Sequence, residues 1–562
     1  MRISLTEWTK SGSPWIWLNA GAVAISIIMV VGLLGLIAVR GLGHFWPADV
    51  IQANHVHDGQ STPIIGEVVE IEDVPAEQLR GAGVDVPEGV PTMRRDLLKI
   101  GNRDVGGLDF TWVLDDYLKD RSKPEMIFTA EREEWGNFYG YLRSVKEGET
   151  VVGEYTGYDK TDEYIALWDE FQARIERAED LHDEIYTIQK HEIGAINYEL
   201  ERLRLKQRSL ELKGETDQSE FDAINNRRDE LNSEYEALQA QLVDLYTQIN
   251  RDSITAEVSN GQTVTIAVAK IVRAFRPNDM GLFEKIGHYG AKLWEFVSDE
   301  PREANTEGGI FPAIFGTVMM VIIMSVLVTP FGVVAAVYLR EYAKQGFVTR
   351  LIRIAVNNLA GVPSIVYGVF GLGFFVYFLG GNIDRLFYPE ALPSPTFGTG
   401  GLMWSSITLA LLTVPVVIVA TEEGLSRIPR AVREGSLALG ATKAETLWKV
   451  VLPMASPAMM TGVILAIARA AGEVAPLMLV GVVKLAPNLP LDGNYPFLHL
   501  DQKFMHLGFH IYDVGFQSPN VEAARPLVYA TAFLLVVVIA LLNISAVQIR
   551  NHLREKYKSL EM

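Results

Sequence analysis

Two charged residues lie inside a long apolar stretch near the C-terminus: Arg469 and Glu473, in the segment ARAAGEVAPL. Residues four apart lie on one side of a helix and can pair. Placing either charge in mid-membrane costs at least about 2.5–3.5 kcal/mol, so such residues usually serve a function. Arginine stays protonated and offers a fork of N–H donors that fits an oxyanion. We therefore expect Arg469 to bind an oxyanion on a transport path, with Glu473 as its partner when the site is empty.

A purely structural role explains the same two residues. Arg469 and Glu473 can form a buried ion pair that only fixes helix packing, or can lie near a helix end and reach water.

Other reactive groups are scarce. The chain has no cysteine, which excludes disulfides, thiolate metal sites and cysteine nucleophiles. His55 and His57 are close in sequence, but two histidines in a polar segment rarely form a metal site. We expect no catalytic residue, no metal and no cofactor.

Six apolar segments are long enough to cross a membrane, which predicts an all-α bundle of six transmembrane helices. The first has 25 residues without a charge, whereas about 20 are sufficient. A cleaved signal peptide would be shorter and would end in small residues, so we expect a retained helix. Prolines interrupt four of the segments, and neighbouring helices tolerate such breaks in transporters. The segments are approximately 15–39, 309–339, 354–380, 401–421, 457–481 and 526–549, with Pro330, Pro363, Pro415 and Pro476 inside them.

The distribution of lysine and arginine predicts the orientation of these helices. Basic residues are concentrated before the first segment, between the second and third, between the fourth and fifth, and after the sixth. Because cytoplasmic loops are enriched in Lys and Arg, both termini should be cytoplasmic. We therefore expect a multi-pass protein of the cell inner membrane. Its parts would be 1–40 with the first helix, a periplasmic block at 41–308, a five-helix core at 309–549 and a basic tail at 550–562.

The block 41–308 is strongly acidic, with 54 acidic and 29 basic residues against 15 and 21 elsewhere. Such a charge argues against nucleic-acid binding, which needs a basic surface. Within it, residues 161–213 and 219–250 have helical spacing, and apolar residues from Leu231 to Ile249 alternate steps of four and three. We expect an α+β insertion that contains a helical hairpin or coiled coil at about 161–250. It is either a docking arm for a partner protein or a solvated structural insertion.

Strand-like segments flank this hairpin. The alternating pattern of residues 63–71 predicts one strand. Residues 254–258 and 263–268 are joined by Asn260-Gly261, a dipeptide typical of tight hairpins, and should pair.

The segment 430–457 has the pattern of two short helices with a turn between them. Gly440 can adopt positive φ and close the first helix. Thr442 and Glu445 have the spacing of a capping box that starts the second, and we expect Pro453 to end it. A rigid helix-turn-helix on the cytoplasmic side suits docking of a soluble partner, although it also fits an ordered loop between two spans.

The same segment resembles the EAA loop of ABC-importer permeases. Glu434-Gly435-Ser436, the glycine six positions after Glu434, Val450 and Leu452-Pro453 all have the family's spacing. Gly435 and Ser436 replace two alanines, and Val450 replaces an isoleucine. Residues 468–477, 361–368 and 308–312 are in addition similar to the PstA family of phosphate-importer permeases. This similarity says little about residues 41–307.

The resemblance implies a type I ABC-importer permease fold and a role for each matching residue. Charged residues of the fifth span, here Arg469 and Glu473, would serve phosphate passage. The loop would couple to an ATPase through Arg433, Glu434, Gly435, Ser436, Gly440, Thr442, Lys443, Glu445, Leu452 and Pro453. The implied partners are a PstC-like second permease subunit, a PstB-like ATPase dimer, a PstS-like periplasmic phosphate-binding protein, phosphate and membrane lipid, with no nucleic acid.

Two alternatives remain open at this point. The cargo can be another oxyanion, such as sulfate or molybdate. A membrane sensor with an extracytoplasmic coiled coil would need a cytoplasmic output domain after residue 339, where four more spans follow instead. The chain has no GxxxxGK[ST] loop for ATP, so we expect a transport subunit and not an enzyme.

Overall fold

The computed structural model describes residues 11–557, apart from residues 58, 82, 85, 87, 88, 216, 519 and 520. Residues 1–10 and 558–562, which carry part of the predicted basic termini, lie outside this range. So does residue 216 in the predicted hairpin turn.

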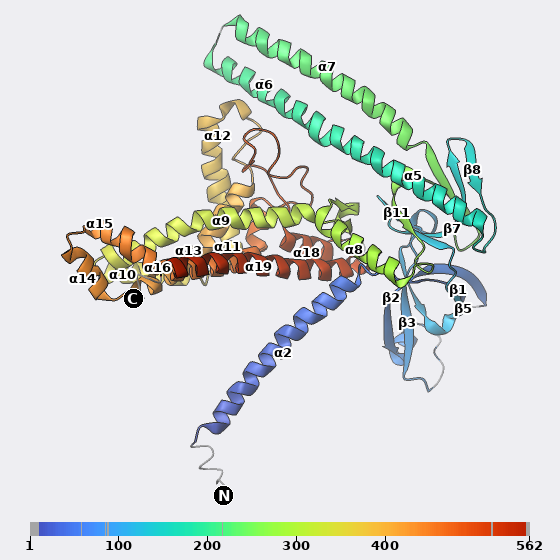
Figure 1. Ribbon diagram of the computed structural model, residues 1–562, viewed down its shortest axis with the longest axis horizontal. Coiled ribbons are helices and arrows are strands. Elements are labelled where there is room, and N and C mark those ends of the chain that lie inside the picture. The colour runs from blue at the N-terminus through green and yellow to red at the C-terminus, as the bar shows by residue number, and fades with distance from the viewer. Residues whose placement is uncertain are drawn as a thin grey trace.

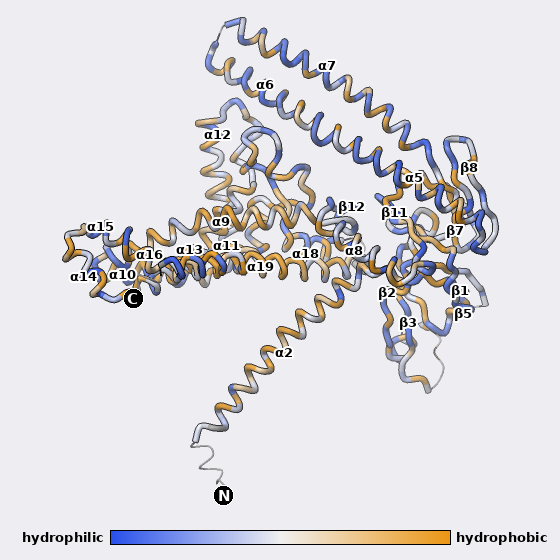
Figure 2. The backbone as a smooth tube through the Cα atoms, viewed as in Figure 1, coloured by the Kyte–Doolittle hydropathy of each residue, from blue (hydrophilic) through white to orange (hydrophobic). Residues whose placement is uncertain are grey.

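Within the described residues, six helices are long and apolar enough to cross a membrane, as the sequence predicts (Figures 1 and 2). The first is α2 (Ser13–Gly43) and the second is α9 (Phe311–Val337). The others are α11 (Ser364–Phe370) with α12 (Gly381–Phe387), α13 (Leu402–Arg427), α15 (Lys443–Thr446) with α16 (Leu452–Ala471), and α19 (Val521–Tyr557).

Helix α13 occupies the centre of the bundle, where it packs against α9 and α16. Small residues allow the close approach, as is common between membrane helices. A Cβ at Gly332 of α9 would lie 2.6 Å from Val417, and a Cβ at Gly462 of α16 would lie 2.7 Å from Ala420. Helix α2 instead diverges from the bundle and crosses α19 near Gly41 and Ala530 (Figure 1).

Two spans differ from the predicted segments because prolines divide them. Residues 354–380 were expected to form one span, but α10 (Phe347–Leu359) is a separate helix and the span starts after Pro363. The span predicted at 457–481 ends at Ala471, and the short α17 (Ala475–Val480) follows. The ring of Pro476 in a continuing helix would clash with the carbonyl group of Gly472. Glu473 therefore lies in the break and not on α16.

The prediction that Pro453 ends the second helix of the 430–457 segment is wrong. One helix runs from Lys443 to Ala471. Residues Leu447–Val451 form a π-helical turn directly before Pro453, which lies in the first turn of α16. A π turn has a wider hydrogen-bond pattern, so it accommodates a residue that lacks an N–H and crowds the preceding carbonyl.

The inserted domain, between α2 and α9, contains two antiparallel sheets. The first has the strand order β4-β3-β2-β1-β5, and the second β10-β9-β7-β6-β11 with β8 beside β7. The predicted hairpin of β9 and β10 is confirmed, with Ile254 opposite Ile266. The strands are β1 (Val50–His57), β2 (Gln60–Pro75), β3 (Thr92–Lys99), β4 (Phe110–Leu114), β5 (Leu118–Ser122), β6 (Ile127–Arg132), β7 (Phe138–Glu147), β8 (Thr150–Glu154), β9 (Asp252–Glu257), β10 (Thr263–Ala267) and β11 (Ile271–Phe275).

Short elements join these strands to one another and to the bundle. Pro301–Arg302 and Glu307–Gly308 form a small two-stranded sheet (β12 and β13) before α9. The helices are α3 (Ala76–Gly81), α4 (Arg103–Gly106) and α8 (Leu282–Ser298).

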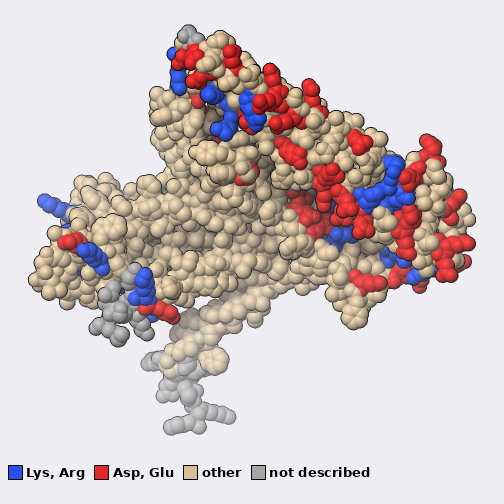
Figure 3. All heavy atoms as spheres, turned by 45° about the horizontal axis from the view of Figure 1, so that its top comes forward, with Lys and Arg blue, Asp and Glu red and all other residues tan. Residues whose placement is uncertain are grey.

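A long helical hairpin extends from the second sheet. It consists of α5 (Asp162–Thr187), a π-helical segment, α6 (Ile193–Lys213) and α7 (Gln218–Ile249). Its acidic and basic side chains are exposed, whereas the visible face of the bundle carries few charges (Figure 3). The hairpin also reaches the loop between α17 and α18 (Leu507–Phe516). Lys190 donates to the carbonyl oxygen of Pro487 at 2.6 Å, and Tyr198 donates to that of Tyr495.

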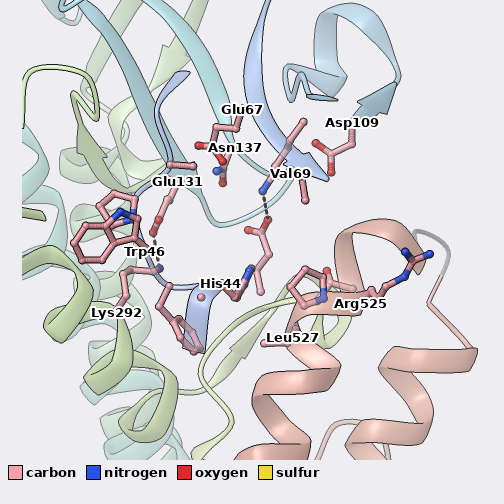
Figure 4. A pocket seen from close by; sticks show the side chains of 18 of the residues that line it. His44, Trp46, Glu67, Val69, Asp109, Glu131, Asn137, Lys292, Arg525 and Leu527 are labelled. Carbon is pink, nitrogen blue, oxygen red and sulfur yellow. Dashed lines mark hydrogen bonds and ion pairs between the residues drawn. The ribbon is translucent and has the colours of Figure 1, made fainter. Parts of the chain in front are cut away.

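A cavity of about 380 Å³ lies where the inserted domain meets the bundle. Its walls come from the end of α2, the sheets, α8 and the start of α19 (Figure 4). Charged side chains of both signs line it and pair across it. Lys292 of α8 lies 2.8 Å from Glu131 of β6 and 2.9 Å from Glu295. Arg525 of α19 lies 3.1 Å from Glu70 of β2. The pair of Arg525 and Glu70 fastens the inserted domain to the bundle, whereas the pair of Lys292 and Glu131 joins α8 to β6 within the domain.

Glu131 has a strongly shifted pKa. Burial alone would raise the pKa of this carboxyl group, but the charge and hydrogen bond of Lys292 outweigh that effect and lower the pKa to about 2. The group therefore contributes stability that is complete above its ordinary pKa of 4.5 and is lost as the pH falls through about 2.

We predict that Lys292→Met destabilises the inserted domain by about 3–5 kcal/mol, because it leaves a buried carboxylate unpaired. The variant should also lose the decline in stability below about pH 4.5 that Glu131 causes in the parent chain. Thermal unfolding of the full chain in detergent, followed by tryptophan fluorescence at several pH values, measures both effects. Lys285→Met is the matched control. Lys285 pairs with the more exposed Asp49, so that variant should lose about 1 kcal/mol or less.

Candidate functional site

The break between α16 and α17 carries the two charges that the sequence singles out. Arg469 is in the last turn of α16, and Glu473 follows two residues after the helix ends. The Arg469 Nε atom lies 3.5 Å from Oε1 of Glu473, and the side chains are 33% and 21% exposed. Among the described residues, Glu473 is the only carboxylate within ion-pair distance of Arg469. The pair is loose, so the guanidinium retains N–H donors for a ligand.

Close packing between helices holds this break in place. A Cβ at Gly368 of α11 would lie 2.6 Å from the Cα of Pro476, so α11 and α17 touch through their backbones. Gly371 approaches the side chain of Thr408 on α13 in the same way. Tyr367, one residue before Gly368, donates to the carbonyl oxygen of Leu359 at 2.6 Å. The segment after Glu473 is thus positioned by helices that meet at glycine.

The geometry suits reversible binding of an anion. A guanidinium group offers up to five N–H donors in one plane and binds oxyanions in a bidentate manner. Its neighbouring carboxylate balances the charge when no anion is present. Both side chains are partly exposed. The same geometry is also that of a half-exposed ion pair at a helix end.

One side of the loop between α13 and α16 packs against the bundle. Arg433 of α14 (Arg430–Ala438) donates to the carbonyl oxygens of Ile428 and Leu425, both at 2.7 Å, and pairs with Glu341 at 2.9 Å. Lys443 donates to the carbonyl oxygen of Glu341 and lies over the ring of Tyr342 at 4.5 Å. These two basic residues therefore hold the loop against the end of α9.

The turn inside this loop has the local geometry that the sequence predicts. Gly440 adopts φ of 90°, and the capping box is present. The Thr442 N–H donates to the Glu445 carboxylate at 2.9 Å, and the Glu445 N–H donates to the Thr442 hydroxyl at 3.2 Å. The hydroxyl groups of Ser436 and Thr446 are 2.9 Å apart and join the two helices.

The opposite side of the loop exposes apolar side chains. Leu439 is 91% exposed and Trp448 is 73% exposed. Glu434 and Gly435 are exposed beside them, whereas Leu452 and Pro453 are half-buried in the bundle. Sequence reasoning missed Leu439 and Trp448, although large apolar residues in an otherwise polar loop are a usable signal. It also missed the partner of Arg433, because Glu341 is 92 residues away.

His55 and His57, which the sequence does not favour as a metal site, lie on β1. Their ring centroids are 6.2 Å apart and lie near the ring of Tyr117. In the part of the chain that the structure describes, no group of three His, Asp or Glu side chains could hold a metal ion.

Known proteins are similar to the part of the chain that forms the bundle. A family model described as "Binding-protein-dependent transport system inner membrane component" matches residues 328–558, which lie wholly after the inserted domain. The "Phosphate transport system permease protein PstA 1" of Mycobacterium tuberculosis (strain CDC 1551 / Oshkosh) is 34% identical over 247 residues, 43% of this chain and 71% of that protein. The "Probable phosphate transport system permease protein PstA" of Methanocaldococcus jannaschii is 30% identical over 42% of this chain and 74% of that protein.

Two further matches are to other ABC transporters. The "Probable ABC transporter permease protein YqgH" of Bacillus subtilis is 31% identical over 208 residues, and the match spans 63% of its length. A chain of the MetNI methionine ABC transporter is 17% identical with a TM-score of 0.30 over 43% of this chain and 94% of that one. The two PstA relatives are each at least 30% identical and are matched over more than two thirds of their length. The chain therefore belongs to the PstA-like permeases of ABC importers.

Proposed function

We propose that this chain is the permease subunit through which an ABC importer passes inorganic phosphate across the inner membrane. The observation that carries the proposal is the loosely paired guanidinium of Arg469 at a helix break, in a chain whose relatives are named for phosphate transport. Arriving phosphate takes the place of Glu473 as the partner of Arg469. When phosphate leaves, the carboxylate re-forms the pair, so the anion is not held too tightly to move on.

The proposed orientation places residues 41–308 in the periplasm and both termini in the cytoplasm. The distribution of basic residues supports it. The arrangement in Figure 1 is compatible with it, because the inserted domain lies at one end of the bundle while α14, α15 and the C-terminal end lie at the other. A periplasmic phosphate-binding protein would then deliver its ligand at the end that carries the inserted domain.

We further propose that the loop 430–457 couples transport to ATP hydrolysis on a partner ATPase dimer. The exposed Leu439 and Trp448 provide an apolar docking surface beside Glu434 and Gly435. Because the helix from Lys443 to Ala471 is unbroken, a displacement at the loop moves the other end of the same rod, where Arg469 lies. A second permease subunit would complete the translocation path beside this chain.

Arg469→Gln should lower phosphate uptake about 100-fold, because it removes charge-assisted hydrogen bonds worth roughly 3 kcal/mol. Arg469→Lys keeps the charge but loses the planar fork, so its uptake should be intermediate. The measurement is uptake of labelled phosphate in cells that carry each variant in place of the native chain. Sulfate uptake, membrane insertion and ATPase recruitment are measured in the same cells.

Normal phosphate uptake by Arg469→Gln would mean that the arginine only packs the bundle. If deletion of the whole chain leaves phosphate uptake unchanged under phosphate limitation, in cells without a second importer, phosphate is the wrong cargo. Loss of sulfate uptake instead would identify the other oxyanion.

Leu439→Glu tests the coupling surface separately. A charge in the centre of an apolar contact should cost at least about 2 kcal/mol, roughly thirty-fold in affinity for the ATPase. Co-purification of the ATPase with the chain measures this loss. Leu212→Glu is the control, because Leu212 is an exposed leucine at the tip of the hairpin in the inserted domain. Equal ATPase recovery with both variants would exclude Leu439 from the contact.

A further inference from the structure

Helix α8 turns three of its charged side chains toward the protein. Lys285, Lys292 and Glu295 follow one another at steps of seven and three, on one side of the helix. Each forms an ion pair with another part of the inserted domain: Lys285 with Asp49 at 2.6 Å, Lys292 with Glu131 at 2.8 Å, and Glu295 with Arg302 at 2.8 Å.

The opposite side of α8 is apolar and faces outward. Phe283 is 88% exposed, Trp294 is 71% exposed and Ile286 is 50% exposed. Phe283 precedes Lys285 by two residues and Trp294 follows Lys292 by two residues, which places each about 200° around the helix axis from that lysine. A surface helix in water has the reverse arrangement, with the apolar side against the core. The environment outside α8 must therefore favour apolar side chains.

The position of α8 identifies that environment. The ring of Phe296 near its C-terminal end lies 4.9 Å from that of Phe45, directly after the membrane helix α2. The carbonyl oxygen of Phe296 accepts a hydrogen bond of 2.9 Å from the N–H of Ile310, directly before the membrane helix α9. One end of α8 thus touches the ends of two spanning helices. Trp46, which is partly exposed, lies 5.9 Å from Tyr289 of α8.

We propose that α8 is an interfacial helix whose apolar side, with Phe283, Ile286 and Trp294, lies in the boundary between phospholipid headgroups and acyl chains at this end of the bundle. Helices of this kind bury one apolar face in the interface, and tryptophans are enriched at that depth. Trp46 and Trp294 fit this pattern.

Lipid fits this surface better than a protein partner does. A protein interface carries roughly one hydrogen bond per 100–200 Å². The exposed side chains of Phe283, Ile286 and Trp294 offer only one indole N–H. The proposal requires that the chain spans a membrane, and it does not depend on the cargo. If α8 lies in the interface, its ion pairs with the rest of the inserted domain fix the distance of that domain from the membrane surface.

Site-directed spin labelling tests the proposal without background, because the chain has no cysteine. Phe283→Cys and Trp294→Cys report on α8. Val30→Cys on the exposed membrane helix α2 is the lipid reference, and Val243→Cys on the exposed face of α7 is the water reference. The labelled full-length chains are placed in vesicles of phosphatidylethanolamine and phosphatidylglycerol. Collision rates of each nitroxide with oxygen, which enters lipid, and with a water-soluble nickel chelate are then compared.

We expect the oxygen-to-nickel ratio at positions 283 and 294 to shift from the value at 243 toward the value at 30. A ratio equal to that at 243 would overturn the proposal, because α8 would then face water. Low collision rates with both reagents would also overturn it, since a protein surface would then cover the helix. Ile286→Cys reports on the same side of α8 if either variant fails to insert.

Discussion

The arrangement of the bundle around Arg469 depends on where a single helix continues and where it stops. From Lys443 to Ala471 the chain forms one unbroken helix, which passes through a π turn directly before Pro453. It stops at Gly472 because Pro476 cannot continue it. One end of the helix carries the exposed loop, and the other ends beside the guanidinium of Arg469. The two features that the resemblance assigns to separate functions are therefore the two ends of one rigid element.

Local patterns predicted much of this from the sequence. The six spans, the capping box of Thr442 and Glu445, and the turn at Gly440 follow from interactions between residues a few positions apart. The effect of each proline on its helix was harder to predict, because nothing in the sequence around Pro453 and Pro476 distinguishes the two. One follows a π turn that absorbs its ring, and the other follows a glycine where the helix can end. Neither outcome is visible without the neighbouring helices.

Contacts between distant segments could not be predicted. They attach the inserted domain to the bundle at three places: the ion pair of Arg525 and Glu70, the hairpin contact at Pro487, and Asn305, which donates to the carbonyl oxygen of Lys484 at 2.9 Å. Two of these hold the loop that directly follows α17. A domain of 41–308 that looked like an independent acidic block in the sequence is thus fixed to the segment next to Arg469.

The most direct test of the account asks whether phosphate occupies the break between α16 and α17. Gly472 is exposed, and a Cβ there meets no atom closer than 3.9 Å, so Gly472→Cys should preserve the helices in this otherwise cysteine-free chain. In the assembled, transport-competent importer, the rate at which a water-soluble thiol reagent labels Cys at this position is measured with and without ligand. The account predicts that phosphate slows labelling and that sulfate does not. Equal rates with phosphate, sulfate and neither would contradict a phosphate path at Arg469.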